Sequence, residues 1–227
     1  MNVKRLIDNL DKNATPEEVM ELEYDLCRLM QIQGKRETTP PYITKALYAF
    51  CRSVTVEQPE YINVSKTQGY RPNQCFPNVQ EQISRFGGAM QCGWTIWDWP
   101  NIMITAEAHA NWVSPEGEKY DITPKDETKI LFLPDSRVQY DGYSMPSLRK
   151  PYTNSPLVME LILLRDYMDE MTSMIEPDSN DNRIVSLPAP ILKRIHEIQL
   201  IFRQPTNQNS TCPCQSGLKY KRCCGKQ

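Results

Sequence analysis

Along residues 102–113 every second side chain is apolar, and those between them are polar except Met103 and Val113. The two sets fall on opposite faces of an extended chain, and a period of two is typical of a half-buried β-strand. Residues 114–117 read Ser-Pro-Glu-Gly, which favours a turn, and residues 118–122 then return as a partner strand. The pattern predicts a β-hairpin at the centre of the chain.

Apolar residues at spacings of three and four predict helices on both sides of this hairpin. Their stripes run through residues 15–34, 43–54, 76–86, 157–175 and 190–201. Thr15 and Glu18 form a capping box at the start of the first helix, and Gly87 with Gly88 ends the third.

Further short strands are predicted at residues 90–99, 130–133 and 137–140, and loops at residues 56–74 and 146–156. With the hairpin, these strands form an antiparallel sheet of about five. We therefore expect an α+β domain over residues 1–203, in three successive parts. They are a helical part at 1–55, a Cys-containing helix with the sheet at 75–143, and a second helical part at 155–203.

Composition narrows the class of protein. The 227 residues are 40% hydrophobic and 24% charged, enough for one sizeable core and a small appendage. A formal net charge of −2 gives no reason to expect a specific nucleic-acid partner. The chain has no apolar run of about 18 residues and no apolar core of a signal peptide near its start, so we expect no membrane span. Eight cysteines then indicate metal ligands, core thiols or a nucleophile in a reducing cytoplasm.

Cys75 lies at the start of the predicted helix 76–86, where free backbone N–H groups and the helix dipole favour a thiolate over a thiol. His109 lies on the polar face of the hairpin strand. A turn folded about Pro115 and Glu116 places Asp121 opposite His109 or one position from it, and such cross-strand neighbours have Cβ atoms about 5 Å apart. The sequence therefore predicts a carboxylate beside an imidazole.

This order, a helix-opening Cys, a strand His and an Asp on the next strand, is similar to that of papain-like and transglutaminase-like thiol enzymes. The segment from His109 to Asp121 resembles the transglutaminase-like group in particular. The resemblance implies a papain-like/transglutaminase-like core with Cys75 as nucleophile. Papain-like sites also place a Gln upstream of the nucleophile, so Gln68 and Gln74 are candidates for the oxyanion donor, with solvated loop side chains as the alternative. Three other cysteines fit apolar positions and are interpreted as core thiols, namely Cys27, Cys51 and Cys92.

The C-terminal cysteines have the spacing of a zinc site. Cys212 and Cys214 flank one proline, and Cys223 and Cys224 follow after eight residues. Four thiolates at this spacing can enclose one structural Zn²⁺ per chain, and so short a module depends on the metal to fold. Residues 211–227 closely resemble the SEC-C motif, the zinc-binding tail of the translocation ATPase SecA, although Gln215 replaces its usual Gly. A polar linker at 204–210 would join this module to the domain.

Two functions remain open at this point. In the first, Cys75, His109 and Asp121 transfer an acyl group from a protein or peptide substrate, as a peptidase, amidase, deamidase or transglutaminase. In the second, the scaffold is not catalytic and the protein is an adaptor. The SEC-C resemblance implies a docking tail, whose partner could be a chaperone, a ribosome or another protein. Its five basic residues fit such a role: Arg203, Lys219, Lys221, Arg222 and Lys226.

Overall fold

The computed structural model describes residues 37–65, 69–143, 145–175, 189–203 and 206–225, with a few positions between 15 and 24. Most of the predicted helix at 15–34, Cys27 and Gln68 lie outside the described residues. The helices and strands run in the order α3 (Lys45–Val54), β1 (Glu60–Val64), α4 (Cys75–Phe86), β2 (Ala89–Trp99), β3 (Met103–Val113), β4 (Lys119–Asp121), β5 (Lys129–Pro134), β6 (Leu148–Pro151), α5 (Pro156–Ser173), α6 (Ala189–Arg203) and the short 3₁₀ helix η1 (Tyr220–Arg222).

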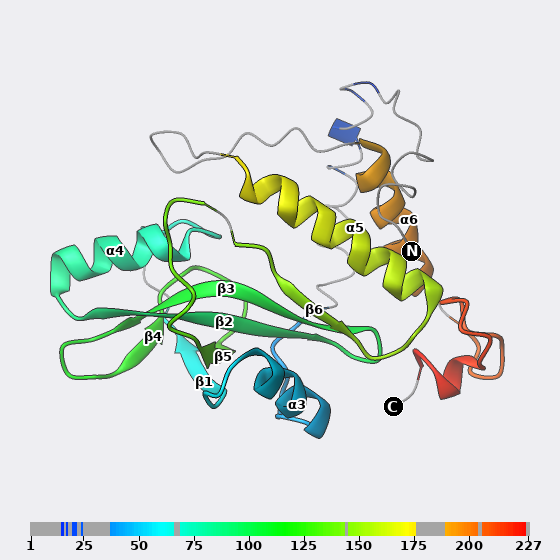
Figure 1. Ribbon diagram of the computed structural model, residues 1–227, viewed down its shortest axis with the longest axis horizontal. Coiled ribbons are helices and arrows are strands. Elements are labelled where there is room, and N and C mark those ends of the chain that lie inside the picture. The colour runs from blue at the N-terminus through cyan, green and yellow to red at the C-terminus, as the bar shows by residue number, and fades with distance from the viewer. Residues whose placement is uncertain are drawn as a thin grey trace.

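Five of the strands close into a small barrel. The ring runs β2-β5-β1-β4-β3, and a β2–β3 pairing closes it, while β6 adds to β3 outside the ring. All neighbouring pairs are antiparallel except β1 and β4. Helices α4 and α5 lie on one side of the strands and α3 on the other (Figure 1). The chain is therefore a mixed α+β protein, as the sequence predicts.

The two faces of the long β2–β3 ladder have different environments. The face with Trp94, Ile96 and Ile104 packs against Leu47 and Phe50 of α3. The opposite face contributes Trp97 to a cluster inside the barrel with Ile62, Ile130 and Phe132. His109 and Asn111 share this interior face, because residues two apart in a strand point the same way.

A third apolar cluster joins α5 and α6 to the barrel. Trp99, Ile102 and Met103, at the β2–β3 connection, are buried against residues of both helices such as Leu161 and Ile198. This cluster supports the layer of helices beside the barrel. No described helix combines the length and the apolarity that crossing a bilayer requires.

Three predicted segments are wrong. Residues 137–140 form no strand, because Arg137 donates from its backbone and its guanidinium to Asp135 and Val138 N donates to Asp135 O, which makes a turn. Strand β1 falls in the predicted loop 56–74, and its pairing with β4 and β5 overrides a weak local pattern. Strand β6 falls in the predicted loop 146–156 and ends at Pro151 on the edge of β3.

The hairpin forms as predicted, with a different register. Ser114 N donates to Glu118 O, so the loop has three residues and ends at Gly117 with a φ of 89°. The ladder pairs Trp112 with Tyr120. Continued by one residue, this register sets Asp121 across from Asn111 rather than His109. Asp121 still lies on the face of His109, now diagonal to it.

Candidate active site and metal centre

Cys75 is the first residue of α4, as predicted, and its side chain is 8% exposed. Gln74 at the N-cap makes no side-chain capping bond, and Pro77 has no N–H. Asn78 N is the first to donate within the helix, to Gln74 O at 3.0 Å. The amides of Cys75 and Phe76 are therefore the donors that the first turn directs outward.

The loop before Cys75 is anchored to α4 itself. The Asn78 carboxamide accepts from Arg71 N at 3.2 Å and donates to Arg71 O at 2.8 Å. The Tyr70 hydroxyl donates to Gln82 one turn further along the helix. These bonds fix the approach to the thiol, and buried Asn78 and Gln82 have their partners there.

His109 lies at a gap in the strand pairing. One edge of β3 pairs with β2 along its whole length. Its other edge pairs with β6 over Met103–Ala106 and with β4 at Trp112 and Val113. Residues 107–111 have no described strand neighbour on that edge, which gives the start of α4 access to His109. Cys75 and His109 line the same cavity, and the charge of Cys75 is the largest influence that raises the pKa of the imidazole.

Asp121 is fully buried and lies against His109, with 3.1 Å between His109 Nε2 and Asp121 Oδ1. The ring N–H does not point along this line, so the contact is an ion pair rather than an aligned hydrogen bond. Thr123 N donates to the same Oδ1 at 3.0 Å, and the Lys125 ammonium pairs with Oδ2. Asp121 is therefore held from three sides.

Lys125 is the member of this site that sequence reasoning missed. It follows Asp121 by four residues in a segment without regular secondary structure. Charges four residues apart are expected to pair only on a helix, so the sequence gives no sign of this contact. Glu107 and Asn111 flank His109 on the same face of β3, but neither pairs with the imidazole. Glu107 accepts a hydrogen bond from Trp97 Nε1 at 2.7 Å, and Asn111 is buried with neither side-chain atom partnered.

The electrostatics of the pair favour charged partners. Burial lowers the pKa of His109, but the negative charges of Cys75 and then Asp121 outweigh it and raise the pKa to about 9. Burial raises the pKa of Asp121, yet His109 and then Lys125 outweigh it and hold the pKa at about 2. An imidazolium beside a carboxylate is thus the stable form at neutral pH.

We predict that the His109 ring titrates near pH 9 in the folded protein, well above its ordinary 6.5. Because the folded-state pKa is raised, this group stabilises the fold fully below about pH 6.5, and that contribution is lost as the pH rises through about 9. NMR titration of the ring protons checks this, since the chain has 2 histidines and only His196 must be separated from it. Asp121→Asn should lower the midpoint; a midpoint at or below 6.5 in the wild type contradicts the charged pair.

A cavity of about 860 Å³ opens beside these residues. Cys75 and His109 line it, together with Trp97, Trp99 and residues of α5. This volume lies in the range of small-molecule and peptide side-chain sites. The thiol, although largely buried, therefore faces an accessible space.

The remaining thiols of the described domain are less suited to reaction. Burial raises the pKa of Cys51 to about 11, and burial followed by the charge of Cys75 raises the pKa of Cys92. Cys51 is buried in the α3 cluster, and Cys92 packs against it, so both occupy the apolar positions that the sequence predicts. Neither lines the cavity beside His109.

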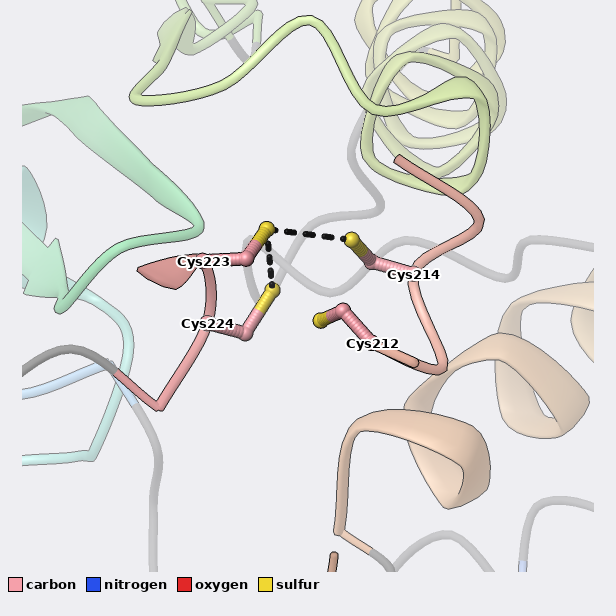
Figure 2. A group of neighbouring side chains, drawn as sticks. All are labelled: Cys212, Cys214, Cys223 and Cys224. Atoms are coloured by element: carbon pink, nitrogen blue, oxygen red, sulfur yellow. Dashed lines mark hydrogen bonds between the residues drawn. The ribbon is translucent and has the colours of Figure 1, made fainter. Parts of the chain in front are cut away.

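The four C-terminal cysteines converge on one point (Figure 2). Their sulfur atoms all lie within 4.8 Å of one another, with 3.4 Å from Cys214 to Cys223 and 3.8 Å from Cys223 to Cys224. A tetrahedral zinc site with bonds of about 2.3 Å separates its sulfurs by about 3.8 Å. The arrangement therefore fits a four-thiolate metal site.

The backbone of this module is folded around the cysteines. Cys212 N donates to Leu218 O at 2.7 Å, and Tyr220 N donates to Ser210 O at 2.9 Å. Residues of the predicted linker also take part, since Lys221 N donates to Gln208 O at 3.0 Å. The folded C-terminal module, which we call the knuckle, thus extends from residue 208 to residue 225 and includes part of the predicted linker 204–210.

The module is not isolated from the domain. The Ser155 hydroxyl, at the N-cap of α5, donates to Cys214 O, and Cys224 packs against the α5–α6 cluster. Phe202 of α6 contacts the cysteine cluster and meets Trp99 edge to face at 5.8 Å. Folding of the tail is therefore coupled to the end of the domain that carries Trp99.

Gln215 occupies a strained position in this knuckle, with a φ of 65°. This left-handed conformation costs an ordinary residue roughly 1 kcal/mol, and glycine adopts it freely. We predict that Gln215→Gly raises metal affinity about fivefold, measured by competition with a chromophoric chelator. Gly217→Ala, at a φ of 77° with no atom near its Cβ, is the matched control and should lower the affinity. Equal affinities for all three proteins would refute the strain.

The comparisons with known proteins agree with this tail. Residues 209–226 match the SEC-C motif, which confirms the predicted motif, and the four converging cysteines are consistent with a metal-binding site. No curated protein and no solved structure matches the chain.

Proposed function

We propose that this protein is a cysteine-dependent acyl-transfer enzyme with a papain-like/transglutaminase-like core. The reaction class covers peptidases, amidases, deamidases and transglutaminases. One observation carries the proposal. Cys75 opens helix α4 and lines, with His109, a cavity of about 860 Å³; His109 Nε2 lies 3.1 Å from Oδ1 of the fully buried Asp121, and the charge of Cys75 acts on the imidazole.

In the proposed reaction the Cys75 sulfur attacks the substrate carbonyl and forms a C–S bond, while the carbonyl π pair moves to oxygen. The outward amides of Cys75 and Phe76 would stabilise this oxyanion, with the Gln74 side chain at the N-cap as a further donor. Gln68, the other candidate, lies outside the described residues. The His109 imidazolium then gives its proton to the leaving group, and the C–N or C–O bond breaks to leave a thioester.

Release of the acyl group reverses these roles. Water or an amine attacks the thioester, and His109, now neutral, accepts the proton as the Cys75 thiolate departs. Asp121 orients the imidazole and stabilises its charged form in both half-reactions. Lys125 and Thr123 N act indirectly, because they hold in place the Asp121 carboxylate that faces His109.

We predict that mild alkylation with iodoacetamide at pH 6 modifies Cys75 first among the cysteines of the domain. The physical reason is that a thiolate, not a thiol, is the nucleophile, and an adjacent imidazolium favours the thiolate. Burial raises the pKa values of Cys51 and Cys92, so these remain thiols. Peptide mapping by mass spectrometry measures the order, and Cys75 left unlabelled until denaturation would remove the thiolate from the proposal.

We further propose that the C-terminal metal is one structural Zn²⁺ per chain. Four thiolates close the tetrahedral shell, so no position is left for a substrate or an activated water. The module exposes Lys219, Lys221 and Arg222, with Leu218 half-exposed between its turns. This surface would suit a protein partner with acidic side chains.

The exposed basic surface favours a second candidate function, a non-catalytic adaptor that docks on a chaperone, a ribosome or another protein through its tail. The two functions differ in what they require of Cys75. An adaptor does not require a reactive thiol at Cys75, whereas the enzyme does. Both accommodate a reducing cytoplasm, which suits the free thiols of the described cysteines.

A further inference from the structure

A second, smaller cavity adjoins Cys75. Its volume is about 230 Å³, and it lies between the start of α4, strand β3 and the C-terminal half of α5. Six of its described lining residues also line the larger cavity, namely Asn73, Cys75, Glu107, Ala108, Ser147 and Asp169. The two spaces therefore meet at the proposed nucleophile.

The charges on the walls of the two cavities differ. The basic side chains of the larger cavity all have acidic partners, since Arg165 pairs with Glu37, Arg149 with Asp166 and Asp169, and Lys125 with Asp121. The charged residues among the described lining of the smaller cavity are the two carboxylates Glu107 and Asp169. The smaller cavity is therefore acidic.

Glu107 has no direct ion-pair partner among the described residues, although it interacts at longer range with the charge of Arg165. Its Oε2 accepts from Trp97 Nε1 at 2.7 Å, which holds the carboxylate in place without neutralising it. No described cation lies within ion-pair distance of Glu107, whereas Asp169 is bound by Arg149 at 2.9 Å. Glu107 is thus a fixed negative charge beside the thiol.

Aromatic rings complete the wall of this cavity. Phe76 and Tyr140 stack with ring centroids 4.6 Å apart, and Tyr143 lies nearby with 38% of its surface exposed. A carboxylate combined with aromatic rings is a favourable environment for an organic cation, since the ring faces carry negative electrostatic potential. An apolar or acidic substrate side chain would give Glu107 no cationic partner, only its hydrogen bond from Trp97.

We propose that the smaller cavity binds a cationic side chain of the substrate, a primary ammonium or a guanidinium next to the carbonyl that Cys75 attacks, with Glu107 as the residue that selects it. This inference rests on the proposed acyl-transfer function and names its substrate class. Because Cys75 itself lines the cavity, the side chain of an acyl group bonded to its sulfur can enter this space.

The test uses three peptidyl acyloxymethyl ketones that differ only in the side chain next to the reactive carbonyl. Lysine carries the cation, norleucine is its uncharged analogue, and glutamate carries the opposite charge. The rate of Cys75 modification in the full chain is measured by mass spectrometry at pH 7. We expect the lysine probe to react about tenfold faster than the norleucine probe, and the glutamate probe to be slowest.

Glu107→Gln removes the charge and nearly keeps the shape of the side chain, so it should bring the lysine and norleucine rates together. Glu116→Gln removes the same charge in the turn between β3 and β4, away from both cavities, and should preserve the preference. The same rates are also measured in His109→Ala. If this change slows the norleucine probe but the lysine probe reacts no faster than norleucine in the wild type, the cation site is overturned and the enzyme proposal stands. No His109-dependent reaction with any probe would remove the proposed function, and the cation site with it.

Discussion

Cys75→Ala is expected to abolish turnover of an activated ester or amide, and His109→Ala to reduce kcat by about 10³-fold. The first change removes the atom that forms the thioester. The second removes the group that carries the proton in both half-reactions, a role typically worth 10²–10⁴-fold. Steady-state and burst kinetics measure both effects, and Cys92→Ala, which removes a thiol of raised pKa, should leave turnover near that of the wild type.

Asp121→Asn separates orientation from proton transfer. If Thr123 N and Lys125 still hold the side chain, the imidazole keeps its position and kcat falls less than in His109→Ala. The losses of the three variants should not add, because the residues act on one step. Additive losses would indicate that Asp121 and His109 act independently and not as one unit.

Metal removal is expected to unfold the C-terminal knuckle and to leave the barrel folded. Apparent binding free energies of structural zinc are about 10–16 kcal/mol, and so small a module has no sufficient apolar core of its own. Cys223→Ser should lower metal content from one equivalent to near zero in elemental analysis. Truncation after Asn209 should do the same.

The remaining domain should lose some thermal stability after metal removal or truncation but stay folded. Loss of the Ser155 contact with Cys214 O and of Cys224 packing on the α5–α6 cluster should lower Tm by several degrees, while one cooperative transition remains. Cys92→Ser is the matched control and should retain the metal. Full metal content in the truncated protein would mean that the site lies elsewhere, and loss of all cooperative unfolding would make the tail part of the core.

Local pattern is sufficient to predict the elements with strong periodicity. The β3 alternation, the helix that Cys75 opens and the knuckle cysteines all follow from residues close in sequence. The convergence of the four cysteines is predictable, because they lie within one short segment and need only local turns to meet.

Non-local pairing explains what the sequence does not reveal. Strand β1 has one buried residue, Ile62, so its place between β4 and β5, and with it the closure of the barrel, has no local signal. One extra loop residue at Gly117 shifts the hairpin register, so Asp121 reaches His109 diagonally. Lys125 and the acidic cavity arise from segments that meet only in the folded chain.

The most direct test of activation of Cys75 by His109 is the rate at which an electrophilic probe for cysteine hydrolases modifies Cys75 at pH 6. We expect rapid adduct formation in the wild type, a large loss of rate in His109→Ala, and no adduct at this position in Cys75→Ala, mapped by mass spectrometry. Far-ultraviolet circular dichroism of each variant establishes that it is folded. Equal rates in the wild type and in folded His109→Ala would show that the imidazole does not activate the thiol, and would leave the adaptor as the function of this protein.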